Sequence, residues 1–243
     1  MTTPPDPLTP ILKASSDTPF VVAQLGQSLD GRIATPTGES RWINRDAALD
    51  PLHRLRAAVD AVLVGIGTVI ADDPRLNVRR IPLPANKDHP ARIVIDPSGR
   101  LPHQAKLLTD DGATCITINA FDCAKAAPAA CQQLHLARQK NGFCPRDIVS
   151  TLFKKGYKKL LIEGGAKTVS QFIDAGAVDR LHVLVAPMII GSGQMGLELA
   201  PIDKIDQSLR PPSNVHVLAD GDVLFDCDLA KARANFGMGL QTQ

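Results

Sequence analysis

The sequence predicts an α/β protein with a mainly parallel sheet, helices on both faces and an antiparallel edge at its C-terminal end. Short, continuous apolar runs, such as residues 61–65 and 92–96, alternate with helical patterns. Such runs are typical of parallel strands that are covered on both faces. Beyond Asp179 the apolar residues instead alternate with period two, and the turn Asp220-Gly221 joins two such segments as a hairpin. Strand–helix alternation followed by a hairpin indicates this architecture.

Composition narrows the class of protein. The 243 residues are 44% hydrophobic and 21% charged, which is ordinary for a soluble globular protein. A net charge of +2 gives no basic field for nucleic acid or an anionic membrane. The longest apolar run, residues 183–190, is too short to span a bilayer and contains Pro187. No signal-peptide pattern opens the chain, and we expect a cytoplasmic protein.

The elements of the first half follow one another with clear boundaries. Residues 1–18 are rich in proline and predict a disordered tail, and the strand 20–23 opens a domain that we place at 19–230. A helix follows, with one apolar face. Further strands are predicted at 61–65, 92–96 and 115–118. The apolar face of the helix is formed by Leu49, Leu52, Leu55 and Val59.

The second half is less regular before residue 145. Leu134 and Leu136 suggest a strand within 120–145, but the surrounding prolines and alanines leave no clear strand periodicity. A helix is then predicted around 148–153, a strand at 160–163, and a helix that ends at Gly176. Residues 231–243 are expected to form a C-terminal tail.

The turn after the strand 160–163 is the strongest local indication of a ligand site. Glu163 is followed by Gly164 and Gly165, and a helical pattern begins directly afterwards. A helix that starts there directs unpaired N–H groups and its positive dipole end outward. Glycines allow an anion such as a pyrophosphate to approach that backbone closely.

Other motifs carry less information. Residues 191–196 match G-x-G-x-x-G, but no amphipathic helix follows, so a mobile loop is favoured over a dinucleotide fingerprint. His182 and His216 are interpreted as surface positions on a sheet. The five cysteines show no C-x-x-C spacing, which argues against a metal site and a disulfide framework. An arginine cluster is either a solvated face or a phosphate clamp; its members are Arg54, Arg56, Arg75, Arg79 and Arg80.

Several motifs in order resemble the riboflavin-pathway pyrimidine reductase family, the C-terminal domain of bacterial RibD. They are Ser28-Leu29-Asp30-Gly31-Arg32-Ile33-Ala34, Gly38-Glu39-Ser40-x-Trp42-Ile43, His53-x-Leu55-Arg56-Ala57, Asp60-Ala61-x-Leu63-Val64-Gly65, Thr68-Val69-x-x-Asp72-Asp73-Pro74-x-Leu76, Glu163-Gly164-Gly165, Val178-Asp179, Ala186-Pro187 and Gly191. The resemblance implies a dihydrofolate-reductase-like α/β fold. It also implies NADPH-dependent reduction of the ribosyl group of a phosphoribosylaminopyrimidine, 5-amino-6-(5-phosphoribosylamino)uracil, by a homodimer.

The resemblance also implies roles for individual residues. The positions that match cofactor contacts are Gly26, Trp42, Thr68, Asp72, Ser98, Gly164 and Gly165. The positions that match substrate contacts are Ser40, Arg56, Leu76, Arg79 and Glu163. Ser98 is expected at the adenosine 2′-phosphate, and we hypothesise that Arg56 and Arg79 bind the ribose 5-phosphate. No residue is assigned as the proton donor.

Two departures leave the substrate open. Gln24 stands where the family usually has a lysine, and residues 120–145 have no clear counterpart. A reductase of the non-deaminated diaminopyrimidine or of a pterin is therefore an alternative. A non-catalytic ligand-binding protein with the same fold is another, because fold does not determine function.

Overall fold

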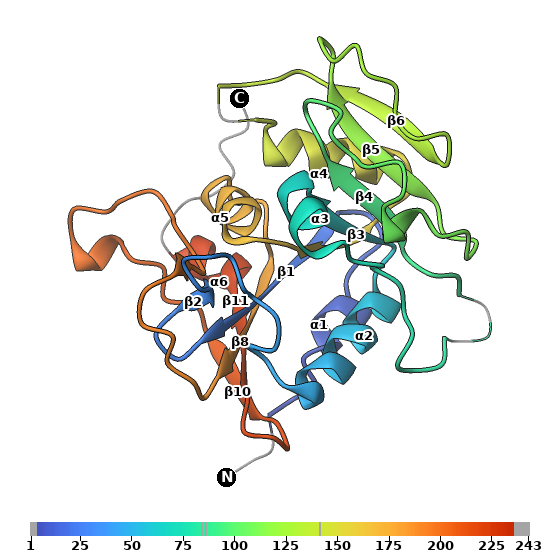
Figure 1. Ribbon diagram of the computed structural model, residues 1–243. Helices are drawn as coiled ribbons and strands as arrows, with labels where there is room; N and C mark the ends of the chain where they lie inside the picture. Colours follow the sequence, from blue (N-terminus) through green and yellow to red (C-terminus); the bar gives the residue numbers. More distant parts are fainter. Residues whose placement is uncertain (1–3, 84, 86, 141, 236–243) are drawn as a thin grey trace.

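The computed structural model describes residues 4–83, 85, 87–140 and 142–235 (Figure 1). Its strands are β1 (Phe20–Ser28), β2 (Arg32–Ala34), β3 (Ala61–Gly65), β4 (Ala91–Ile95), β5 (Cys115–Ala120), β6 (Cys131–Leu136), β7 (Lys159–Glu163), β8 (Arg180–Ala186), β9 (Gln194–Met195), β10 (Ser213–Val217) and β11 (Val223–Asp228). Its α-helices are α1 (Thr9–Leu12), α2 (Leu49–Ala58), α3 (Ile66–Asp72), α4 (Pro145–Lys154), α5 (Ala166–Asp174) and α6 (Leu229–Asn235).

The central sheet has nine strands in the order β10-β11-β8-β1-β7-β3-β4-β5-β6. All neighbours from β8 to β6 are parallel, while β11 pairs antiparallel with both β8 and β10. The predicted topology, a mainly parallel sheet with an antiparallel C-terminal edge, is therefore confirmed. Strand β3 shows why this could be read from the sequence: four of its five residues are buried, as a strand covered on both faces requires.

Helices cover both faces of the sheet, which also agrees with the prediction (Figure 1). On one face α4, α5 and α6 pack against the sheet, and Phe172 of α5 lies in this core. On the other face α1, α2 and α3 contribute Ile11, Leu55 and Val69 to a second core. The amphipathic helices thus bury their apolar faces against a sheet that is apolar on both sides.

Both predicted tails are partly wrong. Leu8 and Ile11 are buried in the second core, and Asp6 forms an ion pair with Arg54 of α2, so the chain is packed well before residue 18. At the other end α6 runs past the predicted boundary at 230, and its Ala232 is fully buried. Residues 1–3 and 236–243 lie outside the described part. The prediction of a disordered tail relied on proline content and overlooked Leu8 and Ile11, two apolar side chains that pack against the sheet.

Residues 120–145 contain the strand that Leu134 and Leu136 suggested. β6 extends the sheet in parallel beside β5, with Cys131 opposite Cys115. The five cysteines are free thiols. An edge strand needs an apolar side chain only where its neighbours cover it, which explains the weak pattern.

The G-x-G-x-x-G segment is a loop that is anchored by a two-residue strand, β9. β9 pairs antiparallel with β2, and Asp30 accepts hydrogen bonds from the backbone N–H groups of Ile190 and Gly191. A Cβ atom at Gly193 would lie 2.1 Å from the carbonyl oxygen of Ala34, so this glycine permits close strand contact. No α-helix directly follows this segment: the next helical turn in the described chain is the three-residue 3-10 helix Ile205–Gln207.

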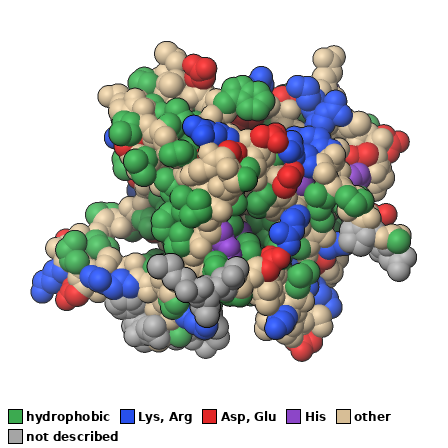
Figure 2. Space-filling model, turned by 90° about the horizontal axis from the view of Figure 1, so that it is seen from below, with side chains coloured by type: hydrophobic (Ala, Val, Ile, Leu, Met, Phe, Trp, Pro, Cys, Tyr) green, Lys and Arg blue, Asp and Glu red, His purple; other side chains and the backbone are tan. Residues whose placement is uncertain are grey.

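Surface charge agrees with the low net charge. On the face shown in Figure 2, Lys and Arg side chains are interspersed with Asp and Glu side chains. Among the described residues, no helix is both long and apolar enough to cross a membrane.

Candidate active site

Two turns meet at the carboxyl ends of β3 and β7. These strands are hydrogen-bonded neighbours, so α3 and α5, which directly follow them, begin side by side. The N–H of Gly165 donates to the hydroxyl oxygen of Thr68 over 3.1 Å. A Cβ atom at Gly165 would lie 3.6 Å from that oxygen and would meet no other described, non-adjacent atom within 4 Å. Gly164, Gly165 and Thr68, three of the expected cofactor contacts, therefore lie together at one turn.

A second group of expected residues surrounds a cavity beside α3. The cavity has a volume of about 310 Å³ and is lined by Gly38, Glu39, Ser40, Arg41, Trp42, Ala71 and Asp72. The Ser40 hydroxyl donates to Asp72 over 3.4 Å. Asp72 is four residues after Thr68, so both side chains lie on the same face of α3. The cavity thus continues the open turn along that helix.

Trp42 has two properties that single it out. Its side chain is 82% exposed, although a large aromatic ring is usually covered. Its backbone has a φ of 71°, in the left-handed region that non-glycine residues rarely adopt. Strain of this kind clusters at functional sites, where the surrounding structure maintains it. The loop therefore presents this ring to the outside at the rim of the cavity.

Glu163 and Arg56 form a nearly buried ion pair. The Nε and Nη2 atoms of Arg56 each donate to a different oxygen of Glu163 over 2.6 Å. Nη1 of Arg56 donates to the carbonyl oxygen of Asn77 over 3.0 Å. The two side chains are only 7% and 13% exposed. Arg56 therefore holds a carboxylate at the end of β7, a role that the sequence did not predict and that competes with phosphate binding.

Arg79 is better placed to bind an anion. Within the described chain its side chain makes one hydrogen bond, a long one of 3.5 Å from Nη1 to the amide oxygen of Asn77, and its backbone N–H donates to Nδ1 of His53. Partial burial, together with the charges of Arg56 and Arg75, lowers the pKa of Arg79. Burial and the charges of Arg56, Arg79 and Arg80 lower the pKa of His53 to about 4. This concentration of positive charge is one that an anionic ligand would relieve.

Two expected contact residues are placed differently. Leu76 is 1% exposed and lies in the core, so only its main chain can face a ligand. At Gly26 a Cβ atom would lie 1.9 Å from the amide oxygen of Asn44, so the Asn44 side chain occupies that space. Asn44 is held there by its hydrogen bond to the buried Asp222.

Ser98, the third expected contact residue outside the cavity, lies in the loop after β4. β4 is the next strand of the sheet beyond β3.

The interpretation of His182 as a surface residue is wrong. His182 is 4% exposed, and its Nε2 lies 3.2 Å from a carboxylate oxygen of Asp226 on the neighbouring strand. Burial alone would raise the pKa of Asp226, but the neighbouring His182 and the guanidinium group of Arg180, which donates to both carboxylate oxygens, hold it at about 2. The alternating pattern of β8 suggested one solvated face, whereas α2 and the N-terminal segment cover that side of the sheet beside His182.

Comparison with known proteins identifies the family to which the chain belongs. A sequence model described as the RibD C-terminal domain matches residues 19–217. The chain belongs to the RibD C-terminal domain family. The expected α/β fold, with a mainly parallel sheet and an antiparallel edge, accompanies this family match.

Two relatives differ in how much of their length this chain covers. The riboflavin biosynthesis protein RibD of Aquifex aeolicus is 35% identical over 196 residues, covering 81% of this chain and 54% of the relative. The 2,5-diamino-6-ribosylamino-4(3H)-pyrimidinone 5′-phosphate reductase of Methanothermobacter thermautotrophicus is 35% identical over 178 residues, covering 71% and 80%. The chain thus spans about half the length of the first relative and most of the second.

Solved structures agree with these matches. RibD of Acinetobacter baumannii superimposes with a TM-score of 0.73 at 32% identity, covering 87% of this chain and 58% of that protein. The Saccharomyces cerevisiae reductase Rib7 superimposes with a TM-score of 0.67 at 20% identity, covering 89% and 92%, which shows the shared fold alone.

Proposed function

We propose that the protein reduces the ribosyl group of 5-amino-6-(5-phosphoribosylamino)uracil to a ribityl group with NADPH. One observation carries the proposal. The carboxylate of Glu163, held by Arg56, and the open turn at Gly164 and Gly165 are consecutive in the chain. A sugar bound by the first and a dinucleotide bound by the second would therefore lie next to each other. Contact of this kind between two reactants is the main requirement for hydride transfer.

The residues of the open turn fit a nicotinamide dinucleotide. Gly164 and Gly165 place no side chain of their own at the start of α5, and the Thr68 hydroxyl, which accepts the Gly165 N–H, can itself donate to a pyrophosphate there. The cavity between Trp42 and Asp72 would take the nicotinamide end. When bound, the nicotinamide would supply a hydride to C1′ of the ring-opened, imine form of the sugar, while the imine nitrogen would take its proton from solvent.

The chain's own residues then bind and orient the substrate. Glu163 accepts hydrogen bonds from the sugar hydroxyl groups, and Arg56 prevents its carboxylate from turning away. Arg79 binds the 5-phosphate, since its guanidinium group has donors that no described carboxylate occupies. In this proposal Arg56 acts through Glu163 and Arg79 acts as the phosphate clamp. The enzyme therefore works by positioning, without an activated nucleophile.

A second candidate substrate is the non-deaminated diaminopyrimidine. It is favoured by the archaeal relatives that are named as 2,5-diamino-6-ribosylamino-4(3H)-pyrimidinone 5′-phosphate reductases, of which this chain covers 80% and 93%. Both candidates carry the same phosphoribosylamino group, so the proposed contacts of Glu163 and Arg79 apply to either. We further propose a cytoplasmic homodimer, which light scattering on the purified protein would test.

The test is oxidation of NADPH by purified protein in the presence of each pyrimidine. We expect stoichiometric oxidation with one of them, and the ratio of kcat/KM values decides which is the substrate. Binding of both pyrimidines without any oxidation of NADPH would contradict the proposal and favour a non-catalytic ligand-binding protein.

A further inference from the structure

The segments that leave β4, β5 and β6 at their carboxyl ends converge on one loop. The carbonyl oxygen of Pro97 accepts hydrogen bonds from the N–H of Ala120, over 3.2 Å, and from Nη2 of Arg138, over 2.9 Å. The same Nη2 donates to the hydroxyl oxygen of Ser98 over 3.1 Å. Arg138 follows β6, in the region with no clear counterpart in the family pattern. Its guanidinium group is thereby fixed on the loop after β4.

The rest of this guanidinium group is available to a ligand. The Arg138 side chain is exposed, and no described carboxylate forms an ion pair with it. Its Nε and Nη1 atoms make no hydrogen bond within the described chain, while Nη2 holds it in place. A guanidinium group fixed at one nitrogen can present its other donors to a phosphate in a planar fork.

The charges around the loop favour an anion. Arg100 is exposed, and the stem of Lys125 packs on Gly99, where a Cβ atom would lie 2.8 Å from the Cβ of Lys125. The nearest acid in the chain, Asp96, is fully buried and accepts hydrogen bonds from the backbone N–H groups of Arg100 and Leu101. The exposed Asp122, in the loop after β5, is the acidic residue that opposes these three cations.

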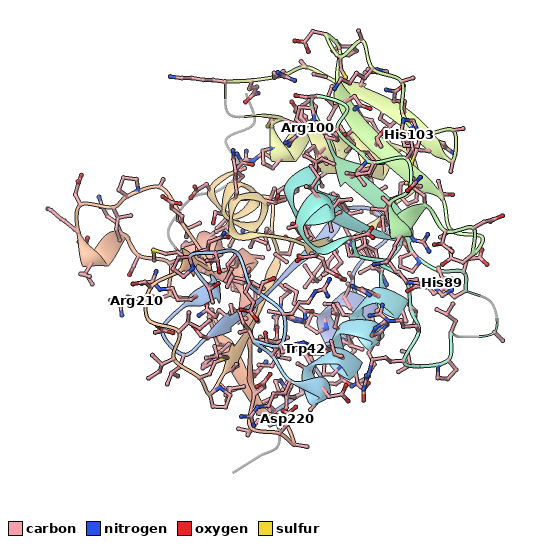
Figure 3. All side chains as sticks on the ribbon, in the orientation of Figure 1. Trp42, His89, Arg100, His103, Arg210 and Asp220 are labelled. Carbon is pink, nitrogen blue, oxygen red and sulfur yellow. The ribbon has the colours of Figure 1, made fainter. Side chains whose placement is uncertain are left out.

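The position of the loop relative to the proposed pyrophosphate site suggests which anion it binds. The turn at Thr68 and Gly165 lies at the ends of β3 and β7, and β4 is the next strand beyond β3. In the view of Figure 3, α3 lies between Trp42 on one side and Arg100 on the other. A dinucleotide whose pyrophosphate occupies the turn, and whose nicotinamide lies toward Trp42, would extend its adenosine toward the loop after β4.

We propose that Arg138, fixed by Pro97 and Ser98, selects NADPH over NADH by binding the 2′-phosphate of the adenosine. This inference rests on the proposed function, because it takes the dinucleotide orientation from it. It assigns the selection to a residue after β6, where the family motifs name none. Ser98 then serves both as a hydrogen-bond partner of the phosphate and as an anchor for Arg138.

The test measures binding of half-cofactors and needs no pyrimidine. Isothermal titration calorimetry compares 2′,5′-ADP, which carries the 2′-phosphate, with 5′-AMP, which lacks it. We expect wild-type protein to bind 2′,5′-ADP more tightly. Arg138→Ala should weaken binding of 2′,5′-ADP by roughly tenfold to a hundredfold, the loss expected for a hydrogen bond to a charged group, and leave 5′-AMP unchanged. The control is Arg210→Ala, an exposed arginine well away from Arg100 in Figure 3.

Three outcomes would overturn the inference: equal affinity of wild-type protein for the two ligands, normal 2′,5′-ADP binding by Arg138→Ala, or equal loss of both ligands. These results are separate from the proposed function. A protein that fails to reduce the pyrimidine, but loses 2′,5′-ADP selectively in Arg138→Ala, would contradict the reductase proposal and support the inference. A protein that reduces the pyrimidine with NADH and NADPH alike would do the reverse.

Discussion

Glu163→Gln should destabilise the protein strongly, because it leaves the charge of Arg56 without its partner. The replacement keeps the shape of the side chain and removes its charge. Arg56 is 7% exposed and would keep only its hydrogen bond to the Asn77 carbonyl and a weaker contact with the new amide. Breaking one partner of a buried ion pair costs about 3–5 kcal/mol. We expect the lower end, about 3 kcal/mol, since Glu163 retains 13% exposure.

Thermal and urea unfolding without ligands measure this loss. In a protein of this size about 1 kcal/mol corresponds to roughly 2–4 °C in Tm, so a fall of about 6–12 °C is expected. Asp6→Asn is a matched control, because Arg54, the partner of Asp6, lies on the same helix as Arg56 but the Asp6–Arg54 pair is 46% and 47% exposed. An exposed pair contributes about 0–1 kcal/mol, and asparagine keeps the oxygen that accepts the N–H of Leu8.

A double variant completes the experiment. Arg56→Met together with Glu163→Gln removes both charges and should recover most of the stability lost by Glu163→Gln. If Glu163→Gln instead costs no more than Asp6→Asn, the pair does not act as a buried ion pair. The account of Arg56 as the residue that holds Glu163 would then be wrong.

Three further predictions concern the cofactor, the phosphate and pH. Gly165→Asp adds a side chain and a negative charge at the proposed pyrophosphate site, so the KM for NADPH should rise at least about tenfold while that for the pyrimidine changes little; equal rises would contradict the cofactor placement. Arg79→Ala should lower kcat/KM for the phosphorylated substrate by roughly tenfold to a hundredfold and abolish its preference over the dephosphorylated one. Arg80→Ala, whose guanidinium group is already held by two aspartates, is the control that should keep that preference. The pKa of Asp226 is depressed to about 2 from an ordinary value of 3.8, so its contribution to stability is complete above about pH 4 and is lost as the pH falls toward 2. The Tm difference between wild type and Asp226→Asn should therefore shrink over this range, and a constant difference would rule out the ionised pair.

Much of the fold could be predicted because the central strands are buried on both faces. β3 is a continuous apolar run and β4 carries the apolar run Ile93-Val94-Ile95, which is the pattern of a strand covered on both faces. The edge strand β6 was only weakly indicated by the sequence, and the short helix α1 was not predicted. β6 has a polar sequence since only part of it is covered, and α1 is a single turn among prolines. Elements that depend on tertiary cover leave little local pattern.

In the candidate site, too, the features with a local sequence pattern could be predicted and those that depend on tertiary contacts could not. Gly164 and Gly165 could be predicted to form a turn because glycines after a strand and before a helix are a local signal. The partner of Glu163 could not, since Arg56 lies 107 residues away and an ion pair has no spacing rule across separate elements. His182 was misassigned because strand alternation shows which side chains share a face, and not whether a helix covers that face. Arg138 lies in a region with no family motif, so only the hydrogen bonds to Pro97 and Ser98 identify it.

Transfer of deuterium from labelled NADPH tests the central claim most directly. The protein is incubated with the phosphoribosylaminopyrimidine and NADPH that carries deuterium at one or the other C4 position, and the product is analysed by mass spectrometry and NMR. The account predicts one deuterium in the product, at C1′ of a ribityl chain, from one of the two labelled cofactors. Deuterium in the pyrimidine ring, or a reduced product that carries none from either cofactor, would contradict it.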